Sequence, residues 1–389
     1  MNDVRALHDW VSAHRDDMLG DLSRYVGLET PSDDKPSLAA GLSWLDGWLR
    51  ERLGGPAALR TTDGGQYGDI HVYDYPGTGK PVLLLCHYDT VWPLGTLAGW
   101  PFRVDGDRVS GPGVFDMKAG LVQAVWALRA LSAAGLPHPP IRLLLNGDEE
   151  IGSPASRPVI EAAAAGTAAT LVFEASADGA LKTARKGVGL FRVLATGVGA
   201  HAGLDPAKGA SAIDELARAV VALHGLTDLE AGTTVNVGVI TGGTRSNVIA
   251  EAAQGNIDVR VSSADEAARI DGALAALRAH DPRAKLSVDG EWNRPVMART
   301  PAVASLYELA RNLAAELGFA LRECSVGGAS DGNFVAALGM PVLDGFGAVG
   351  DGAHARHEHV TISGMLERTA LAAALLHALT TEKGIASPR

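Results

Sequence analysis

The chain has 389 residues, of which 47% are hydrophobic and 20% are charged, and its formal net charge is −11 at pH 7. This composition is that of a globular protein, and it excludes extended disorder and a broad nucleic-acid surface, because phosphate binding needs clustered Lys and Arg. The length exceeds one ordinary hydrophobic core, so roughly two domains are expected.

The first part of the chain alternates between helical and strand-like patterns. Apolar residues at helical spacing predict helices over 4–28, 37–53 and 118–134. Strand patterns, mostly short apolar runs that suit strands buried on both faces, occur at 68–75, 81–86, 141–146 and 170–174. This alternation indicates an α/β domain with a mostly parallel central sheet.

The middle of the chain has a different character. Half-exposed strand patterns occupy 188–196, 232–240 and 255–262, with helices expected at about 209–225 and 264–280. We expect a compact α+β unit here, with two helices on one face of a four-stranded antiparallel sheet.

After Pro295 the α/β pattern returns. A helix is expected at 302–317, a glycine-rich loop at 326–332, a strand at 340–344 and a terminal helix at 361–381. We therefore expect an α/β domain, residues 1–186 and 297–389, interrupted by a smaller α+β domain at 187–296.

The expected compartment is the cytoplasm. The first residues, MNDVRALHDW, lack a basic start followed by an apolar stretch, so no signal peptide is expected. No run of about 18 apolar residues occurs, which argues against a membrane partner. Cys86 lies in an apolar run and is expected to be a reduced, packing thiol.

Potential metal ligands follow the expected buried strands. His87, in CHYDTVWP, can ligate a metal through one ring nitrogen while Asp89 accepts the N–H of the other. In NGDEEIGS, Glu150 can be a ligand and Glu149 a general base. Glu174 ends TLVFE. Ligands of open α/β sheets gather beyond the carboxyl ends of strands. The alternatives are a surface turn with an incidental histidine and an ordinary acidic turn.

Two further candidates lie outside these strand ends. Asp116, in GPGVFDMKAG, has two carboxylate oxygens that could bridge two cations, although it could instead cap the helix that follows. The segment GDGAHARHEHV offers His354, His357 and His359, and the spacing alone favours His354 only weakly.

Two histidines and three carboxylates suit a pair of zinc-like ions that share one carboxylate. Two such ions, about 3.5–4 Å apart, activate a water molecule against an amide or an ester. The sequence therefore indicates a hydrolase.

These motifs, in this order, resemble the two-zinc metallopeptidase and amidohydrolase family that includes glutamate carboxypeptidases, aminoacylases, succinyl-diaminopimelate desuccinylase and carnosine-type dipeptidases. The resemblance covers nearly the whole chain. It implies that one zinc ion is held by His87, Asp116 and Glu174, and that Asp116 bridges to a second, held also by Glu150 and His354. The implied catalytic residues are Asp89 and Glu149, and cobalt or manganese could replace zinc.

The expected middle domain resembles the lid of this family, which is also its dimerisation domain. The resemblance implies a homodimer, and it places His201, in GVGAHAG, against the substrate carbonyl. Asn247 and Arg260 fall on substrate-binding positions, where Arg260 would grip a carboxylate in a bidentate manner. The alternatives are a helix-edge histidine near Asp205 and a charge on the exposed face of a strand.

The branch of the family bears on the substrate. A glutamate at position 174 resembles the carboxypeptidase and deacylase branches, and Lys182 falls where glutamate carboxypeptidases place a lysine near the side-chain carboxylate of the substrate. The expected substrate is therefore a small peptide, folate-like or N-acyl compound ending in glutamate. A surface lysine and an aminoacylase without acidic preference are the alternatives. Cys86 replaces a frequent glycine of the family, and Ala250 replaces a proline.

Overall fold

The computed structural model describes residues 2–380, which form two compact units. The larger unit contains residues up to 184, residues 299–326 and residues from 330 onward, and the smaller unit contains residues 185–298 and 327–329. The sequence places the two boundaries at 186/187 and 296/297. The short segment 327–329 belongs to the smaller unit, and within it Gly328 accepts a hydrogen bond on its carbonyl oxygen from Arg185 Nη1 at 3.0 Å.

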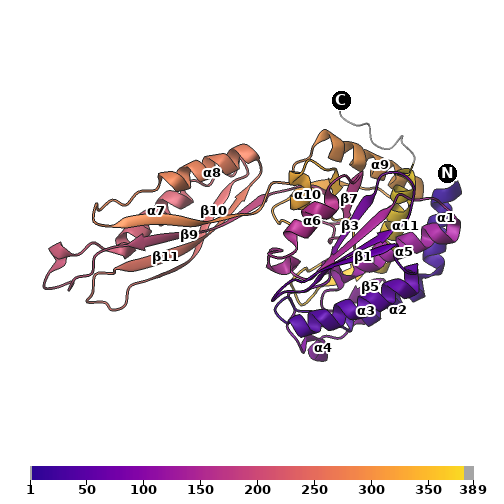
Figure 1. The fold of residues 1–389 in the computed structure, drawn as a ribbon, viewed down its shortest axis with the longest axis horizontal. Coiled ribbons are helices and arrows are strands. Elements are labelled where there is room, and N and C mark those ends of the chain that lie inside the picture. Colours follow the sequence, from indigo (N-terminus) through magenta and orange to yellow (C-terminus); the bar gives the residue numbers. More distant parts are fainter. Residues whose placement is uncertain (1, 381–389) are drawn as a thin grey trace. The chain divides into compact units, whose positions relative to one another are not determined.

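The larger unit is built on a six-stranded sheet (Figure 1) with the order β1-β2-β6-β3-β7-β14. Its strands are β1 (Ala58–Thr62), β2 (Ile70–Tyr75), β3 (Val82–His87), β6 (Ile141–Asn146), β7 (Ala169–Val172) and β14 (Val342–Leu343). Strands β6, β3, β7 and β14 run parallel to one another, whereas β2 is antiparallel to both β6 and β1. The expected α/β class with a mostly parallel central sheet is confirmed, with an antiparallel edge.

The larger unit also contains helices, several of which pack against this sheet. They are α1 (Asn2–Ala13), α2 (Arg15–Val26), α3 (Lys35–Leu53), α4 (Thr96–Gly99), α5 (Ala119–Ala134), α6 (Arg157–Ala164), α9 (Pro301–Leu317), α10 (Gly332–Ala337) and α11 (Ile362–Ala378). Helix α5 packs against α11, and α6 packs against α10 (Figure 1). No helix within residues 2–380 is both long enough and apolar enough to cross a membrane.

One expected helix is interrupted. The apolar spacing over 4–28 continues across residue 14, and residues 4–19 contain no Gly or Pro, but the structure divides the segment into α1 and α2. His14 lies between them with φ −104° and ψ 17°, and its Nδ1 lies 2.8 Å from the carbonyl oxygen of Trp10. The ring thus contacts a carbonyl near the end of α1, where helix carbonyls lack partners within the helix.

Two small sheets complete the larger unit. One contains β4 (Arg103–Asp105), β5 (Arg108–Ser110), β15 (Gly350–Asp351) and β16 (His359–Thr361), in the order β15-β16-β5-β4. The other pairs β8 (Leu181–Arg185) with β13 (Glu323–Val326).

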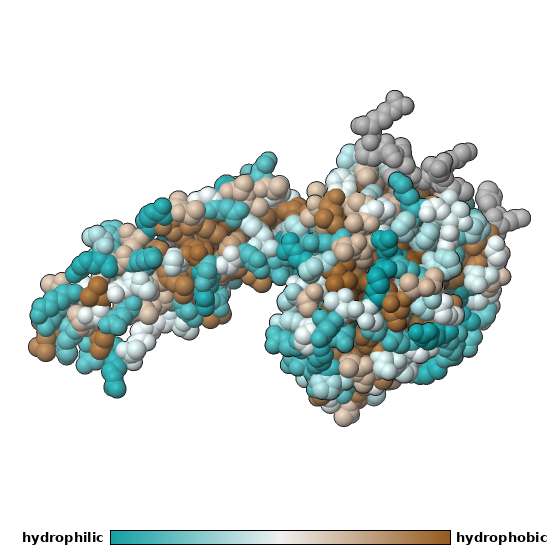
Figure 2. All heavy atoms as spheres, viewed as in Figure 1, coloured by the Kyte–Doolittle hydropathy of each residue, from teal (hydrophilic) through white to brown (hydrophobic). Residues whose placement is uncertain are grey.

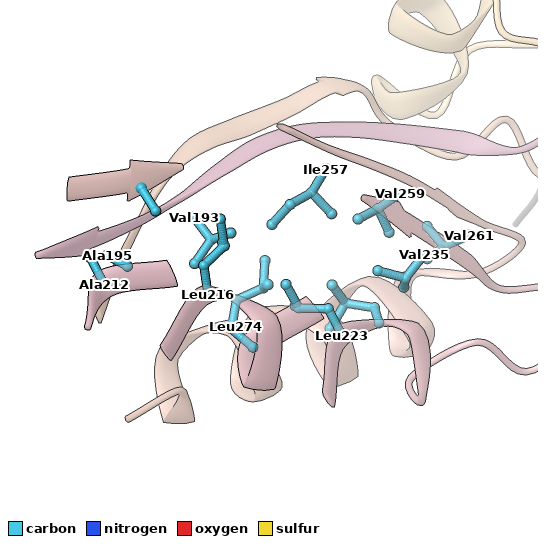
Figure 3. Packing of buried hydrophobic residues seen from close by; sticks show 13 residues of the cluster. Val193, Ala195, Ala212, Leu216, Leu223, Val235, Ile257, Val259, Val261 and Leu274 are labelled. Carbon is cyan, nitrogen blue, oxygen red and sulfur yellow. The ribbon is translucent and has the colours of Figure 1, made fainter. Parts of the chain in front are cut away.

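The smaller unit is a four-stranded antiparallel sheet with two helices. Its strands are β9 (Gly187–Thr196), β10 (Thr234–Gly242), β11 (Ala252–Val261) and β12 (Lys285–Arg294), in the order β10-β11-β9-β12, and its helices are α7 (Ala212–His224) and α8 (Ala264–Ala276). Leu216 and Leu223 of α7 and Leu274 of α8 pack against Val193 and Ile257 of the sheet (Figure 3). The strand β12 has no counterpart among the three ranges expected from the sequence.

Candidate metal centre

Three adjacent strands bring candidate ligands to one edge of the central sheet. In the order β6-β3-β7, neighbouring strands are parallel, so their carboxyl ends lie at the same edge. His87 is the last residue of β3, Glu149 and Glu150 follow β6 in the short turn η2 (Glu149–Ile151), and Glu174 follows β7. This is the position at which ligands of α/β sheets bind.

Asp116 reaches the same place from a kinked turn, η1 (Val114–Lys118), whose Asp116–Met117 peptide bond is cis. Its Oδ1 lies 3.2 Å from His87 Nε2, and its Oδ2 lies 3.3 Å from His354 Nε2. The carboxylate therefore faces a different histidine with each oxygen. It does not cap α5, since the N-cap of α5 is Lys118.

A close approach of α5 to the sheet brings this turn near β7. A Cβ atom added at Gly120 would lie 1.9 Å from the carbonyl oxygen of Phe173, the residue before Glu174. Only glycine permits this distance, so the glycine of the DMKAG motif keeps the Asp116 turn close to Glu174.

The remaining candidates complete two groups that share Asp116. His87 Nε2 lies 3.5 Å from Glu174 Oε1, and His354 Nε2 lies 3.0 Å from Glu150 Oε2. Glu149 also lies near, because it forms with His87 and Glu174 a group whose ligand atoms are within 4.8 Å of one another. The structure thus brings all five candidate ligands and Glu149 together.

Asp89 is buried beneath this cluster and holds several of its parts. Its Oδ1 lies 3.3 Å from His87 Nδ1, while its carboxylate accepts the backbone N–H groups of Glu149 at 3.3 Å and of Glu150 at 3.2 Å. Ser32, which the sequence did not single out, donates its hydroxyl to Asp89 Oδ2 at 2.7 Å. Asp89 therefore orients one histidine and the turn that carries the paired glutamates.

The geometry distinguishes the three C-terminal histidines. Only His354 among them faces Asp116 and Glu150. Its backbone has φ 61°, a left-handed conformation that is uncommon for a residue other than glycine and that clusters at functional sites. His357 is exposed, with Nε2 3.9 Å from Asp351, and His359 contacts the carbonyl oxygen of His357.

Burial and mutual contacts shift the pKa values of the side chains in the cluster. Burial alone would raise the pKa of Asp116, but hydrogen bonds with His354 and His87 outweigh it and hold that pKa well below its usual range. Burial would lower the pKa of His87, yet its contacts with Asp116 and Asp89 raise it well above its ordinary value. Hydrogen bonds to Asp116 and Glu150 raise the pKa of His354 to about 11, while burial and the charge of Asp116 raise that of Glu150 to about 7.

This donor set fits divalent cations. Glu150 Oε1 is buried and has no hydrogen-bond partner among residues 2–380, although an uncompensated buried oxygen is costly. Nitrogen and carboxylate ligands of this kind suit zinc, and also manganese or cobalt. One ion would be held by His87, Asp116 and Glu174, and a second by Asp116, Glu150 and His354.

The candidate substrate residues of the smaller unit form two groups. His201 and Asn247 are exposed and lie on paired segments, since the N–H of Ala202 donates to the carbonyl oxygen of Asn247 at 2.9 Å. Arg260 lies on β11, where Nε and Nη2 each donate to the carboxylate of Asp258 at 2.8 Å. It is therefore paired within its own strand.

Lys182 belongs to the larger unit. It is half-buried in β8, and its backbone N–H donates to the carbonyl oxygen of Asp344 at 2.8 Å. It is thus a strand residue rather than part of an exposed hairpin tip.

Comparison with known proteins identifies the family. Residues 83–378 match the model of peptidase family M20/M25/M40. The chain is 32% identical over 366 residues to "Carboxypeptidase G2" of Pseudomonas sp. (strain RS-16). This alignment covers 91% of this chain and 87% of that protein. The chain therefore belongs to peptidase family M20/M25/M40, a family of metal-dependent peptidases, and the expected resemblance is confirmed.

Solved structures share the fold. The chain matches the aminopeptidase PepT of Bacillus cereus ATCC 10987 with a TM-score of 0.80, at 22% identity, over 94% of this chain and 99% of that one. It also matches the YXEP protein of Bacillus subtilis, described as a dinuclear metal-binding peptidase of the M20 family, with a TM-score of 0.69, at 16% identity, over 95% and 99% of the two chains. At these identities the likeness concerns the fold.

Metal binding to this cluster should release protons. Contacts with neighbouring carboxylates raise the pKa values of His87 and His354, and a ring nitrogen can bind an ion only after losing its proton. The affinity for Zn²⁺ should therefore increase as the pH rises. Calorimetric titration in two buffers of different ionisation enthalpy measures the protons released. The His354→Ala variant should release fewer, and His357→Ala should match the wild type. An affinity independent of pH would contradict this assignment.

Proposed function

We propose that this protein is a two-zinc peptidase that hydrolyses an amide bond and releases a C-terminal amino acid, with glutamate preferred. The observation that supports it most is the carboxylate of Asp116, whose two oxygens face His87 and His354. Cobalt or manganese are substitutes for zinc in this proposal.

The metals and the chain have separate tasks in hydrolysis. When bound, two divalent ions polarise the scissile carbonyl and make the attacking water more acidic. Glu149 takes the proton of that water and returns it to the departing nitrogen as general base and then general acid. Its place supports this role, because its backbone N–H is held by Asp89 and its carboxylate lies near His87 and Glu174.

His201 is suited to donate a hydrogen bond to the oxyanion. Its Nδ1 accepts the backbone N–H groups of Gly203 and Leu204, each at 3.1 Å. An Nδ1 that accepts leaves the proton of the neutral ring on Nε2. The Nε2–H group is then available to the negative oxygen that develops on the substrate carbonyl.

The substrate carboxylates have two proposed partners. Arg260 uses two of its N–H groups on Asp258, which leaves three of the five guanidinium donors for an α-carboxylate. Lys182 is proposed to bind the side-chain carboxylate of a C-terminal glutamate. Similarity to a protein named carboxypeptidase G2 supports C-terminal release. The second candidate is an N-acyl-amino-acid amidohydrolase, in which Arg260 acts without Lys182.

A homodimer through the smaller unit is part of the proposal. Strand β10 is at the edge of its sheet and exposes Val239 and Ile240, while α7 exposes Val221. Figure 2 shows hydrophobic residues reaching the surface of this unit. An unpaired edge strand with exposed apolar side chains is a ready site for pairing with a second copy.

The variant Glu149→Gln tests the hydrolytic role directly. Loss of the general base should lower kcat by about 10²–10⁴-fold, while the variant keeps two equivalents of zinc. Steady-state kinetics and elemental metal analysis measure the two quantities. Glu161→Gln, on α6 and paired with Arg157, is the control and should behave as the wild type. Full activity in Glu149→Gln would sink the mechanism, and loss of zinc would make Glu149 a ligand.

A substrate series tests the preference for glutamate. N-acyl amino acids and dipeptides ending in Glu should be cleaved with a higher kcat/KM than the same compounds ending in Leu. Lys182→Met should raise KM for the Glu series alone, since the lysine charge pairs with the additional carboxylate. Lys80→Met, at an exposed position, is the control. Equal rates for both series would favour the amidohydrolase.

Sedimentation velocity tests the dimer. The wild type should sediment as a dimer at micromolar concentration, and Ile240→Lys should shift it to monomer because a charge would enter the edge-strand contact. Leu229→Lys, exposed outside this edge, should leave the dimer intact. A monomeric wild type contradicts the proposed assembly.

A further inference from the structure

Glu358 is a fully buried acid that belongs to none of the groups above. It lies in the chain between exposed His357 and half-buried His359, and its residue exposure is 0%. A buried carboxylate is costly unless several donors satisfy it. The groups that donate hydrogen bonds to Glu358 must therefore compensate the cost of burying its carboxylate.

Four N–H groups point at the carboxylate of Glu358. Oε1 accepts the backbone N–H groups of Phe115 at 2.8 Å and of Asp116 at 3.0 Å. Oε2 accepts the backbone N–H of Gly113 at 3.0 Å and the indole Nε1–H of Trp92 at 2.8 Å. Three of the four donors come from the turn that carries Asp116.

We propose that Glu358 is a positioning residue that holds the Asp116 carboxylate in its bridging orientation between His87 and His354. Bonds to the backbone on both sides of Val114 fix the path of the turn, and the bond to the N–H of Asp116 fixes the residue itself.

The same segment couples the two halves of the metal site. Glu358 follows His354 by one short loop and directly precedes β16, which pairs with β5. Strand β5 in turn leads into the Asp116 turn. One carboxylate thus ties the loop that supplies His354 to the turn that supplies the shared ligand.

This inference rests on the proposed two-metal function, and it differs from a purely structural role. A buried acid that only stabilises the fold would lower thermal stability when replaced, without changing the affinity of the folded protein for metal. Asp116 lies in both proposed metal sites, so disorder in the turn that carries it should weaken the binding of both ions. Replacing a residue that orients a metal ligand typically lowers the affinity for the metal by about 10–100-fold.

The test is Glu358→Gln, which keeps the size but turns an amide N–H₂ group toward donors. Cobalt titration by calorimetry, below the melting temperature, should show both ions bound about 10–100-fold more weakly. In the manganese-loaded protein, electron paramagnetic resonance should show loss of the exchange coupling between ions that share a ligand. These readouts do not depend on catalysis.

Glu215→Gln is a matched control in the smaller unit. Glu215 is also a buried glutamate that accepts two backbone N–H groups, from His280 at 2.6 Å and from Asp281 at 2.8 Å. Its replacement should lower thermal stability and leave cobalt affinity unchanged. A Glu358→Gln variant with the same behaviour, and with wild-type affinity for both ions, would overturn the positioning role.

Trp92→Phe decides the question if Glu358→Gln does not fold. This variant lacks one of the four donors to Glu358 and should bind both metal ions several-fold more weakly. Wild-type affinity in this variant would contradict the proposal. If the wild-type protein does not bind two metal ions, the proposed function itself is overturned. If the wild type and Glu358→Gln bind two metal ions with equal affinity, only the role of Glu358 is overturned.

Discussion

The carboxylate of Asp116 faces His87 with one oxygen and His354 with the other, and the remaining candidate ligands lie on either side of it. Glu150 and Glu174 approach the same histidines from their own strand ends, so three acids meet in a largely buried space. Their mutual repulsion has to be compensated by positive charge. Contacts with these acids raise the pKa values of His87 and His354, which favours the protonated rings and so supplies positive charge. Two divalent ions would supply it more fully, and Glu150 Oε1 would then gain a partner.

The backbone around the ligands is fixed by buried acids. Asp89 accepts the N–H groups of Glu149 and Glu150, and Glu358 accepts those of Phe115 and Asp116. Each acid therefore holds a turn that carries functional side chains onto the rigid sheet. Metal and catalytic groups must be held to within about 0.5 Å to be effective, and supporting hydrogen bonds of this kind provide that accuracy.

The sequence is informative where side-chain type and strand position coincide. The α/β class follows from buried runs such as 81–86, and His87, Glu150 and Glu174 are candidates because they follow such runs. Glu358 leaves no comparable signal, because three of its four partners are backbone N–H groups more than 240 positions away, where any residue type offers the same donor. The break at His14 is missed because helical spacing continues across it. The bond between Arg260 and Asp258 could be expected, since residues two apart share one face of a strand.

The central claim is that Asp116 bridges two metal ions, and anomalous diffraction at the zinc absorption edge from zinc-loaded crystals tests it most directly. We expect two peaks about 3.5–4 Å apart, one beside His87 and Glu174 and the other beside Glu150 and His354, with one oxygen of Asp116 toward each. A single peak, or two peaks without Asp116 between them, would contradict it.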